Sequence, residues 1–149
     1  MGFFEQEEKK LIFRENGETV WVETWGNDSL RVRSAMLSDV AEGSVALLEN
    51  SKDTQSKAAI AIEEWEASIT NGNIKAVLTV QPWGHALQMA FYNGKGELLL
   101  REISNGGALT RKARHFKPLQ GGDFRLKVSF EGQPGEKIYG MGQYQQERM

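Results

Sequence analysis

The alternation of apolar and polar residues is clearest between Asp123 and Phe130. Phe124, Leu126, Val128 and Phe130 occupy every second position, and polar or charged residues lie between them. Successive side chains of a β-strand point to opposite faces, so this pattern places all four apolar side chains on one face of a strand. The sequence therefore predicts a strand here.

Other short apolar runs are separated by residues that favour turns. We expect strands at 8–13, 18–23 and 29–34, joined through Arg14-Glu15-Asn16-Gly17 and Trp25-Gly26-Asn27-Asp28. Two further hairpins are predicted. One pairs 58–62 with 74–80 and turns at Asn71-Gly72-Asn73, and the other pairs 87–92 with 97–102 and turns at Asn93-Gly94-Lys95-Gly96.

The order of these elements predicts an all-β protein. The short strands follow one another closely, and no helical pattern of 10–15 residues separates them, which favours an antiparallel β-sandwich over a parallel sheet with crossovers. The stretch 38–57 fits neither a strand nor a helix period, and we expect it to be irregular. No repeat or linker divides the chain, so residues 1–149 are expected to form one domain.

Composition and charge narrow the function classes. The chain has 149 residues, no cysteine, and a formal charge of -2 from 18 basic and 20 acidic residues that are interspersed. No basic patch suits nucleic acid, and a disulfide framework is excluded. The N-terminus lacks a signal-peptide pattern, and no apolar run is long enough for a membrane helix, so we expect a cytoplasmic protein without nucleic-acid or membrane partners.

The two histidines are the first candidates for acid/base chemistry. His85 lies in the turn-like segment Gln81-Pro82-Trp83-Gly84-His85, and His115 lies among basic residues. A histidine pair around a sugar ring is suited to aldose anomerisation. A lone histidine is more often structural, and the carboxylate partners of such a mutarotase cannot be identified from the sequence.

The acidic run Glu63-Glu64-Trp65-Glu66 is a second candidate. In a strand these carboxylates cannot converge, because successive side chains face opposite sides, and we interpret the run as a solvated edge. Spacings typical of metal ligands and of phosphate-binding glycine loops are absent from the sequence, so we expect no metal and no cofactor. Gly140-Met141-Gly142 lacks the third glycine of a dinucleotide-binding motif.

Four tryptophans could serve a carbohydrate-binding surface. Trp21, Trp25, Trp65 and Trp83 are the candidates, because an aromatic face can stack on the C–H face of a sugar. The alternative is that they pack inside the sandwich, where most tryptophans are largely buried. The sequence alone leaves both possibilities open.

Three motifs together resemble a known family. They are Trp25-Gly26-Asn27-Asp28-Ser29-Leu30-Arg31-Val32-Arg33, then His115-Phe116-Lys117-Pro118-Leu119, then Phe130-Glu131 leading into Glu136-Lys137-Ile138-Tyr139-Gly140-Met141-Gly142-Gln143-Tyr144-Gln145. In order and spacing they resemble the N-terminal domain of glycoside hydrolase family 31. The last motif is the most specific and is closest to the α-xylosidase-like members, beside the α-glucosidases. The resemblance covers roughly Val20 to the C-terminus.

The resemblance implies a galactose-mutarotase-like β-sandwich that precedes a (β/α)8 barrel and packs on it. The family's catalytic aspartates lie in the barrel, and nothing in this chain matches their motifs, so no catalytic residue is carried over. The family pattern continues beyond Gln145, so we expect the sandwich to be truncated at the C-terminus and the barrel to be absent. Tyr139, Gly140 and Gly142 would then form a structural turn, and Gln143, Tyr144 and Gln145 would face the substrate or the barrel.

The resemblance thus implies a non-catalytic domain of a retaining α-glycosidase that shapes the barrel's substrate pocket and meets carbohydrate through the full-length enzyme. The alternative is a free-standing carbohydrate-binding module with the tryptophans as its platform. A third possibility is the small mutarotase with His85 and His115. An uncovered barrel-facing edge also predicts self-association of the isolated domain.

Overall fold

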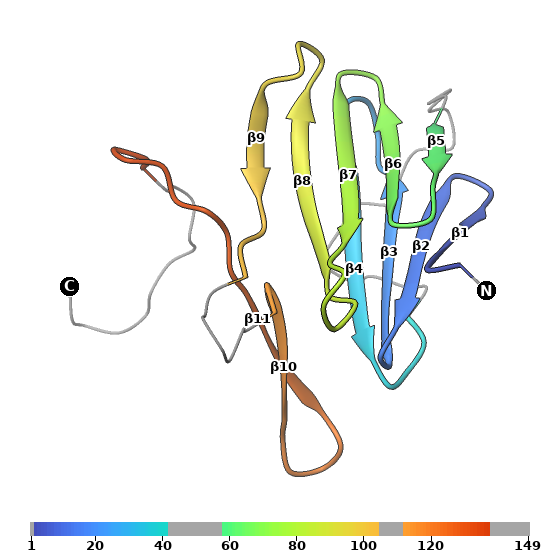
Figure 1. Cartoon of the computed structure of the whole chain (residues 1–149), viewed down its shortest axis with the longest axis vertical. Coiled ribbons are helices and arrows are strands. Elements are labelled where there is room, and N and C mark those ends of the chain that lie inside the picture. Colours follow the sequence, from blue (N-terminus) through green and yellow to red (C-terminus); the bar gives the residue numbers. More distant parts are fainter. Residues whose placement is uncertain (1, 42–57, 105–111, 138–149) are drawn as a thin grey trace.

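The computed structural model describes residues 2–41, 58–104 and 112–137, and it contains only β-strands and connections in those ranges (Figure 1). A four-stranded sheet, a five-stranded sheet and a separate two-stranded hairpin make up the described part, and all strand pairs are antiparallel. The prediction of an all-β, antiparallel fold is therefore confirmed.

The first sheet is a meander in the order β1-β2-β3-β4. Its strands are β1 (Phe4–Glu7), β2 (Lys10–Glu15), β3 (Glu18–Thr24) and β4 (Leu30–Met36). The predicted turn at Asn16 and Gly17 is present, and both residues have positive φ, at 52° and 78°. The strand expected at 8–13 begins later, because the chain turns at Glu8 (φ 50°) and residues 4–7 pair back on β2 as an additional strand.

The second sheet has the order β5-β6-β7-β8-β9. Its strands are β5 (Ala59–Ile62), β6 (Glu66–Asn71), β7 (Ile74–Val80), β8 (Leu87–Asn93) and β9 (Leu98–Arg101). The predicted pairing of 58–62 with 74–80 is wrong, because β6 lies between them and pairs with both. Ala67 and Ile69 are the only apolar side chains of β6, and this weak pattern hid the strand. The turn at 71–73 therefore joins β6 to β7, and the predicted β8–β9 hairpin is confirmed.

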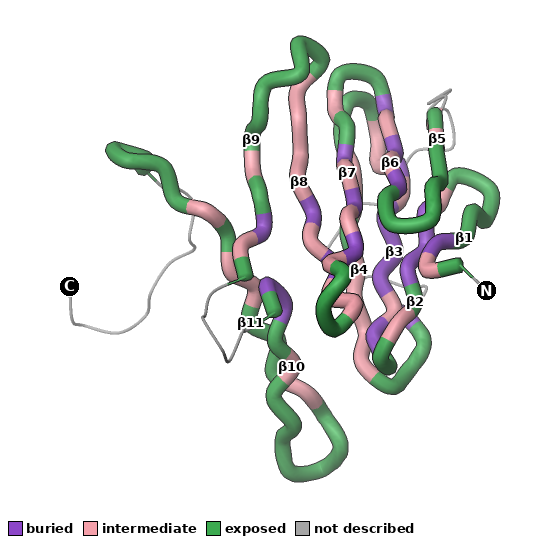
Figure 2. Tube along the Cα trace, in the orientation of Figure 1, coloured by how far each residue is buried: buried purple, intermediate pink, exposed green. Residues whose placement is uncertain are grey.

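The core lies between the two sheets, which makes the fold a β-sandwich (Figure 2). The first sheet contributes Phe4, Leu11, Phe13, Val20 and Val22, and the second sheet contributes Ala67, Ile69, Ala76, Leu78, Val80, Leu87 and Met89. In β6 and β7 every second residue is buried, as the period of two requires. Burial of this apolar surface is the main force that holds the sheets together.

Hydrogen bonds between two turns join the sheets at one end of the sandwich. The Asn71 amide nitrogen donates to the carbonyl oxygens of Gly26 (3.0 Å) and Ser29 (2.7 Å), and the Asn73 backbone N–H donates to Asp28 Oδ1 (2.6 Å). Gly72 is required here: a Cβ at this position would lie 2.1 Å from Asp28 Oδ1, and its φ is +59°. The β3–β4 turn is thereby fixed against the β6–β7 turn.

The third unit is the hairpin of β10 (Arg114–Pro118) and β11 (Phe124–Val128), which extends beyond the sandwich in Figure 1. The predicted strand at 124–130 exists in β11, but its apolar residues are not buried as a core face, because β11 pairs only with β10 among the described strands. At its base, Ser129 N–H donates to Ala113 O, and Ile103 N–H donates to Ser129 O. Of the irregular stretch expected at 38–57, only residues 38–41 are described, and they form no strand or helix.

Candidate functional site

The residues assigned to the barrel-facing site, Gln143, Tyr144 and Gln145, lie outside the described residues. The same holds for the structural turn of Tyr139, Gly140 and Gly142. These assignments stay predictions. The site in the described part must therefore be built from other residues.

The two histidines have different surroundings. His85 follows Gly84 in the β7–β8 connection, where its ring packs on the rings of Phe3 (centroids 5.0 Å apart) and Trp65 (5.7 Å), and its Nδ1 lies 3.2 Å from Glu15 Oε1. His115 is exposed in β10 opposite Lys127. The contacts of His85 join the second sheet to the first, which is a structural role.

The acidic run at 63–66 is exposed, as expected for a solvated edge. Glu63 donates its backbone N–H to Glu66 O (2.8 Å), so residues 63–65 form the tight connection between β5 and β6, and Glu66 begins β6. Within the described ranges no three acidic or histidine side chains are grouped so that they could hold a metal ion. In those ranges no helix has the length and apolar character that a membrane crossing requires.

The four tryptophans divide into buried and exposed rings. Trp21 is buried on the outer side of the first sheet against Ile12 and Val40, with Lys10 Nζ 4.2 Å from its ring centre. Trp25 is half-buried and carries the Arg31 guanidinium at 4.6 Å. Trp65 is 39% exposed and packs on Phe3, whereas Trp83 is 92% exposed. Trp83 is therefore the tryptophan best placed to meet a ligand.

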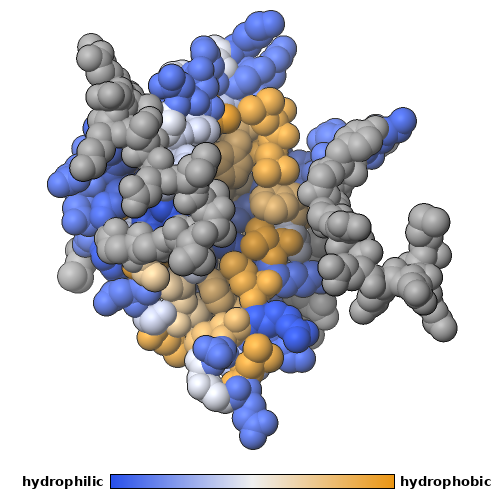
Figure 3. All heavy atoms as spheres, turned by 180° about the vertical axis from the view of Figure 1, so that it is seen from behind, coloured by the Kyte–Doolittle hydropathy of each residue, from blue (hydrophilic) through white to orange (hydrophobic). Residues whose placement is uncertain are grey.

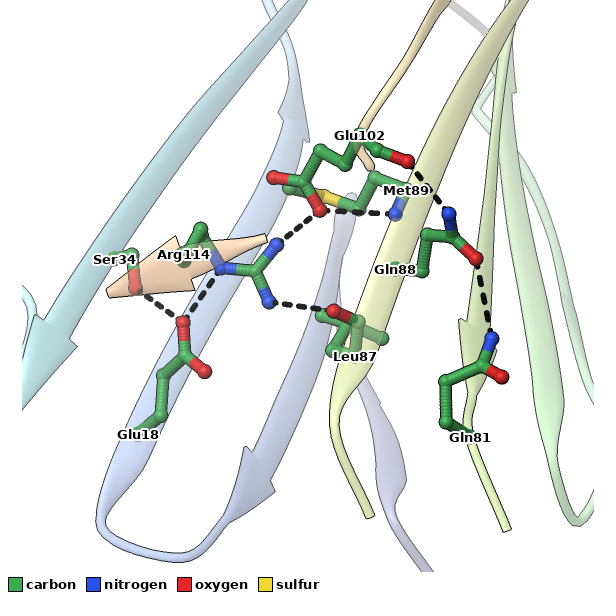
Figure 4. Close-up of polar contacts among 8 residues, drawn as sticks. All are labelled: Glu18, Ser34, Gln81, Leu87, Gln88, Met89, Glu102 and Arg114. Carbon is green, nitrogen blue, oxygen red and sulfur yellow. Dashed lines mark hydrogen bonds and ion pairs between the residues drawn. The ribbon is translucent and has the colours of Figure 1, made fainter. Parts of the chain in front are cut away.

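Arg114 occupies the centre of a buried ionic cluster (Figure 4). Its Nε donates to Glu18 Oε1 (2.6 Å), its Nη1 donates to Glu102 Oε2, and its Nη2 donates to Leu87 O (3.3 Å). Ser34 Oγ also donates to Glu18 Oε1 (3.0 Å). The side chains of Arg114, Glu18 and Glu102 are 3%, 8% and 1% exposed. The cluster thus ties β10 to both sheets.

Burial sets the charge states of this cluster. Desolvation raises the pKa of Glu102 above its ordinary value. The charge and hydrogen bond of Arg114 and the hydrogen bond from the Met89 N–H oppose this rise, whereas repulsion by Glu18 adds to it. Desolvation works to lower the pKa of Arg114, but the two carboxylates outweigh it and raise that pKa. Arg114 is therefore charged, and it is shared by two carboxyl groups of which Glu102 holds its proton more tightly than usual.

Sequence reasoning missed this cluster because nothing local indicates it. Arg114 lies 96 positions from Glu18 and 12 from Glu102. Glu18 begins β3 and Glu102 follows β9, and neither position differs in sequence from those of exposed glutamates. A charged residue directly after a small apolar residue, as in Ala113-Arg114, is too common a pattern to indicate a buried ion.

A chain of amides leads from this cluster to the surface. Gln88 Nε2 donates to Glu102 O (2.6 Å), and Gln81 Nε2 donates to Gln88 Oε1 (3.1 Å; Figure 4). Both glutamines line a hollow of about 320 Å³ next to Trp83, together with Leu87, Ser104 and Lys112. This hollow combines an exposed aromatic ring with amide, hydroxyl and ammonium groups.

A second hollow of about 430 Å³ lies where the β6–β7 and β8–β9 turns approach each other. It is lined by Thr70, Asn73, Lys75, Tyr92 and Asn93 among others. Lys75 and Tyr92 are opposite each other in the β7–β8 register. Tyr92 is half-buried, so this hollow presents less aromatic surface than the one beside Trp83.

Hydrophobic side chains also gather in a band down the face shown in Figure 3. Large apolar residues that are exposed in the described ranges include Val32 in β4 and Leu98 and Leu99 in β9. Exposed apolar surface of this kind favours association. Self-association of the isolated chain stays a prediction, which light scattering at several protein concentrations checks.

Comparisons with known proteins place the chain beside family 31 glycoside hydrolases. It is 40% identical to the uncharacterized family 31 glucosidase ORF2 of Pseudescherichia vulneris, in an alignment of 142 residues that covers 84% of this chain and 25% of that protein. The crystal structure of a GH31 alpha-xylosidase from a soil metagenome, complexed with xylose, matches 96% of this chain and 22% of its own, with 39% identity and a TM-score of 0.78. No protein-family model matches the chain.

These findings confirm the resemblance to family 31 in both sequence and fold. The chain spans about a quarter of the length of the relatives it matches. The structural match also fits the β-sandwich described above.

Proposed function

We propose that the chain is a non-catalytic β-sandwich domain of a retaining α-glycosidase of the α-xylosidase or α-glucosidase type. In this role it adopts the galactose-mutarotase-like arrangement, packs on a (β/α)8 barrel and shapes the barrel's substrate pocket. The observation that carries the proposal is the match of 96% of this chain to only 22% of a GH31 alpha-xylosidase. On this proposal, the catalytic part of the enzyme lies outside the region that this chain matches.

The chemistry of the buried carboxyl pair supports a structural role. Retaining glycosidases need two carboxyl groups about 5–5.5 Å apart that both reach the sugar. Glu18 and Glu102 come together through Arg114, but their side chains are 8% and 1% exposed and no sugar can reach them. Their function in this domain is to join β10 to the sandwich.

Hydrolysis assays test this proposal. The 149-residue chain and the complete reading frame that encodes it are expressed separately and assayed with p-nitrophenyl α-xyloside and p-nitrophenyl α-glucoside. We expect no hydrolysis by the chain alone and hydrolysis of at least one substrate by the complete product. Turnover by the chain alone, or a complete product that cleaves neither substrate, would overturn the proposal.

A carbohydrate-binding module is the second candidate. One observation favours it: Trp83 is 92% exposed beside a hollow to which Gln81 and Gln88 contribute amide groups. A module of this kind binds saccharide without the barrel, whereas a pure scaffold does not. In both cases the cytoplasmic location stays a prediction, which fractionation of cells that express the native gene checks.

A further inference from the structure

We propose that the hollow beside Trp83 is a binding subsite for a neutral saccharide, and that Trp83 provides its stacking face. The described residues that line the hollow include Gln81, Trp83, Gln88, Ser104 and Lys112. Only the choice of xylose- and glucose-based probes rests on the function proposed above.

The first argument is the exposure of Trp83. A tryptophan that is 92% exposed leaves a large apolar ring in water, which is unfavourable unless something covers it. The C–H face of a sugar ring is one cover that an indole face fits, and the polar edges of the sugar then need hydrogen-bonding partners nearby. The hollow adjoining Trp83 contains such partners.

The second argument is that the loop carrying Trp83 is held in place on both sides. Gln81 donates its backbone N–H to Ala86 O (2.9 Å), which closes the loop at its base. Asn16 Nδ2 donates to Gly84 O (3.2 Å), and His85 Nδ1 lies 3.2 Å from Glu15 Oε1, so the first sheet anchors the far side. A preorganised loop loses little conformational entropy when a ligand binds.

The third argument is the orientation of the amide wall. The hydrogen bonds from Gln81 to Gln88 and from Gln88 to Glu102 O fix both side chains. A primary amide has two donor hydrogens and an oxygen that accepts two hydrogen bonds. These contacts use one donor of Gln81 and one donor and one acceptor site of Gln88, so capacity for sugar hydroxyls is left on both.

The size and charge of the hollow indicate the ligand class. A volume of about 320 Å³ is near the lower end of ligand pockets and suits a mono- or disaccharide. Among the described residues that line it, Lys112 is the one charged residue, and Ser104 adds a hydroxyl. Amide and hydroxyl groups around an aromatic ring match a neutral polyhydroxylated ligand better than a phosphate, which would need several cations.

The test is a titration of the 149-residue chain followed through the indole N–H resonance of Trp83 in a ¹H–¹⁵N spectrum. Trp83→Ala assigns that resonance. The probes are xylose, xylobiose, glucose and maltose, with sorbitol as a polyol that lacks a ring. We expect at least one saccharide to shift the Trp83 resonance with saturation, and sorbitol to have no effect.

Variants identify the site. Gln81→Leu keeps the bulk of the side chain and removes the amide, and we expect it to weaken binding about tenfold, with Trp83→Ala weakening it at least as much when binding is followed by calorimetry. Tyr92→Ala, in the second hollow, is the matched control and should leave the affinity unchanged.

Three results would overturn the subsite: no saturable shift with any saccharide, an equal response to sorbitol, or binding that survives Trp83→Ala. The first result is expected if the natural cover of Trp83 is another part of a larger enzyme and not a saccharide. Such failure would leave the scaffold role intact, because that role is decided by the hydrolysis assays and not by binding to this chain.

Discussion

Strands β7 and β11 have similar sequence patterns but opposite surroundings. In β7, Ala76, Leu78 and Val80 alternate with other residues and are buried completely or nearly so. In β11, Phe124, Leu126 and Val128 alternate with Arg125 and Lys127, yet Leu126 is 42% exposed. Alternation alone therefore does not determine whether a strand face is buried.

The difference lies in the partners of each strand. β7 pairs with β6 and β8, and its inner face meets the first sheet. β11 pairs with β10 alone, and the ring of Phe124 packs on Phe116 within the hairpin (centroids 6.2 Å apart). A period of two indicates which side chains share a face, whereas a second layer of structure is needed to bury them.

The largest expected effect comes from breaking the joint between these two regions. Arg114→Ala would leave Glu18 and Glu102 buried without their counter-ion. Removing one partner of a buried ion pair costs about 3–5 kcal/mol, and we expect the free energy of unfolding in urea to fall by that amount.

Arg101→Ala is the control for this prediction. Arg101 is 44% exposed and its Nη1 lies 3.7 Å from Glu131 Oε2, so solvent screens the pair and its loss should cost under about 1 kcal/mol. Equal losses in the two variants would show that the Arg114 cluster does not hold the hairpin to the sandwich.

Truncation of the β7 core face is expected to be next in size. Leu78 is fully buried between the sheets. Leu78→Ala removes buried apolar surface and opens a cavity, and substitutions of this kind cost about 2–5 kcal/mol. Thermal unfolding followed by circular dichroism measures the change, and an effect below about 1 kcal/mol would contradict the assignment of β7 to the core.

A smaller effect should appear in the pH dependence. Because the pKa of Glu102 is raised on folding, the native protein holds this proton more tightly than the unfolded chain. Its contribution to stability is therefore greatest below the ordinary value of 4.5 and is lost as pH rises from there through the raised pKa.

Glu102→Gln removes this titration and keeps a side chain of the same shape. In urea unfolding between about pH 4 and 7, we expect the stability of the original protein relative to this variant to fall as pH rises. A rise over the same range would mean that Arg114 lowers the pKa of Glu102 more than burial raises it.

The smallest effect is expected in β11. Leu126→Ala removes a side chain that is 42% exposed, in a hairpin whose two strands pair only with each other in the described ranges. We expect the free energy of unfolding to change by less than about 1 kcal/mol, since exposed positions tolerate such changes. A loss as large as that of Leu78→Ala would show that the hairpin face is covered in solution, for example by a second copy of the chain.

Much of the fold could be predicted from local patterns. The turns at 16–17, 26–28 and 93–96 were located by their glycine, asparagine and aspartate residues, and Asn16, Gly17, Gly26, Asp28 and Gly96 do have positive φ. β6 was missed and its neighbours were mispaired, because its buried face has only two apolar side chains, Ala67 and Ile69, and the polar Asn71 at the third buried position. β10 was not predicted as a strand either, since only Phe116 and Pro118 interrupt its polar residues.

The candidate site was predicted less well. The residues of the family motif at 139–145 lie outside the described part, and the four tryptophans could not be ranked from sequence. The structure separates them by exposure: Trp21 is buried, whereas Trp83 is 92% exposed. Nothing in the sequence indicated Gln81 and Gln88 as site residues, because their interaction depends on the fold, which places the two amides 3.1 Å apart.

The sequence by itself determined that this protein is built from short antiparallel strands and that it resembles family 31. Turn residues, alternation of apolar residues and sequence motifs are local properties that can be recognised without the fold. Only the tertiary structure decided which alternating strand is buried, which carboxylates share Arg114, and which tryptophan stays in solvent. The physical reason is that burial and ion pairing depend on which distant segments pack together. A strand's own residues restrict that choice but do not make it.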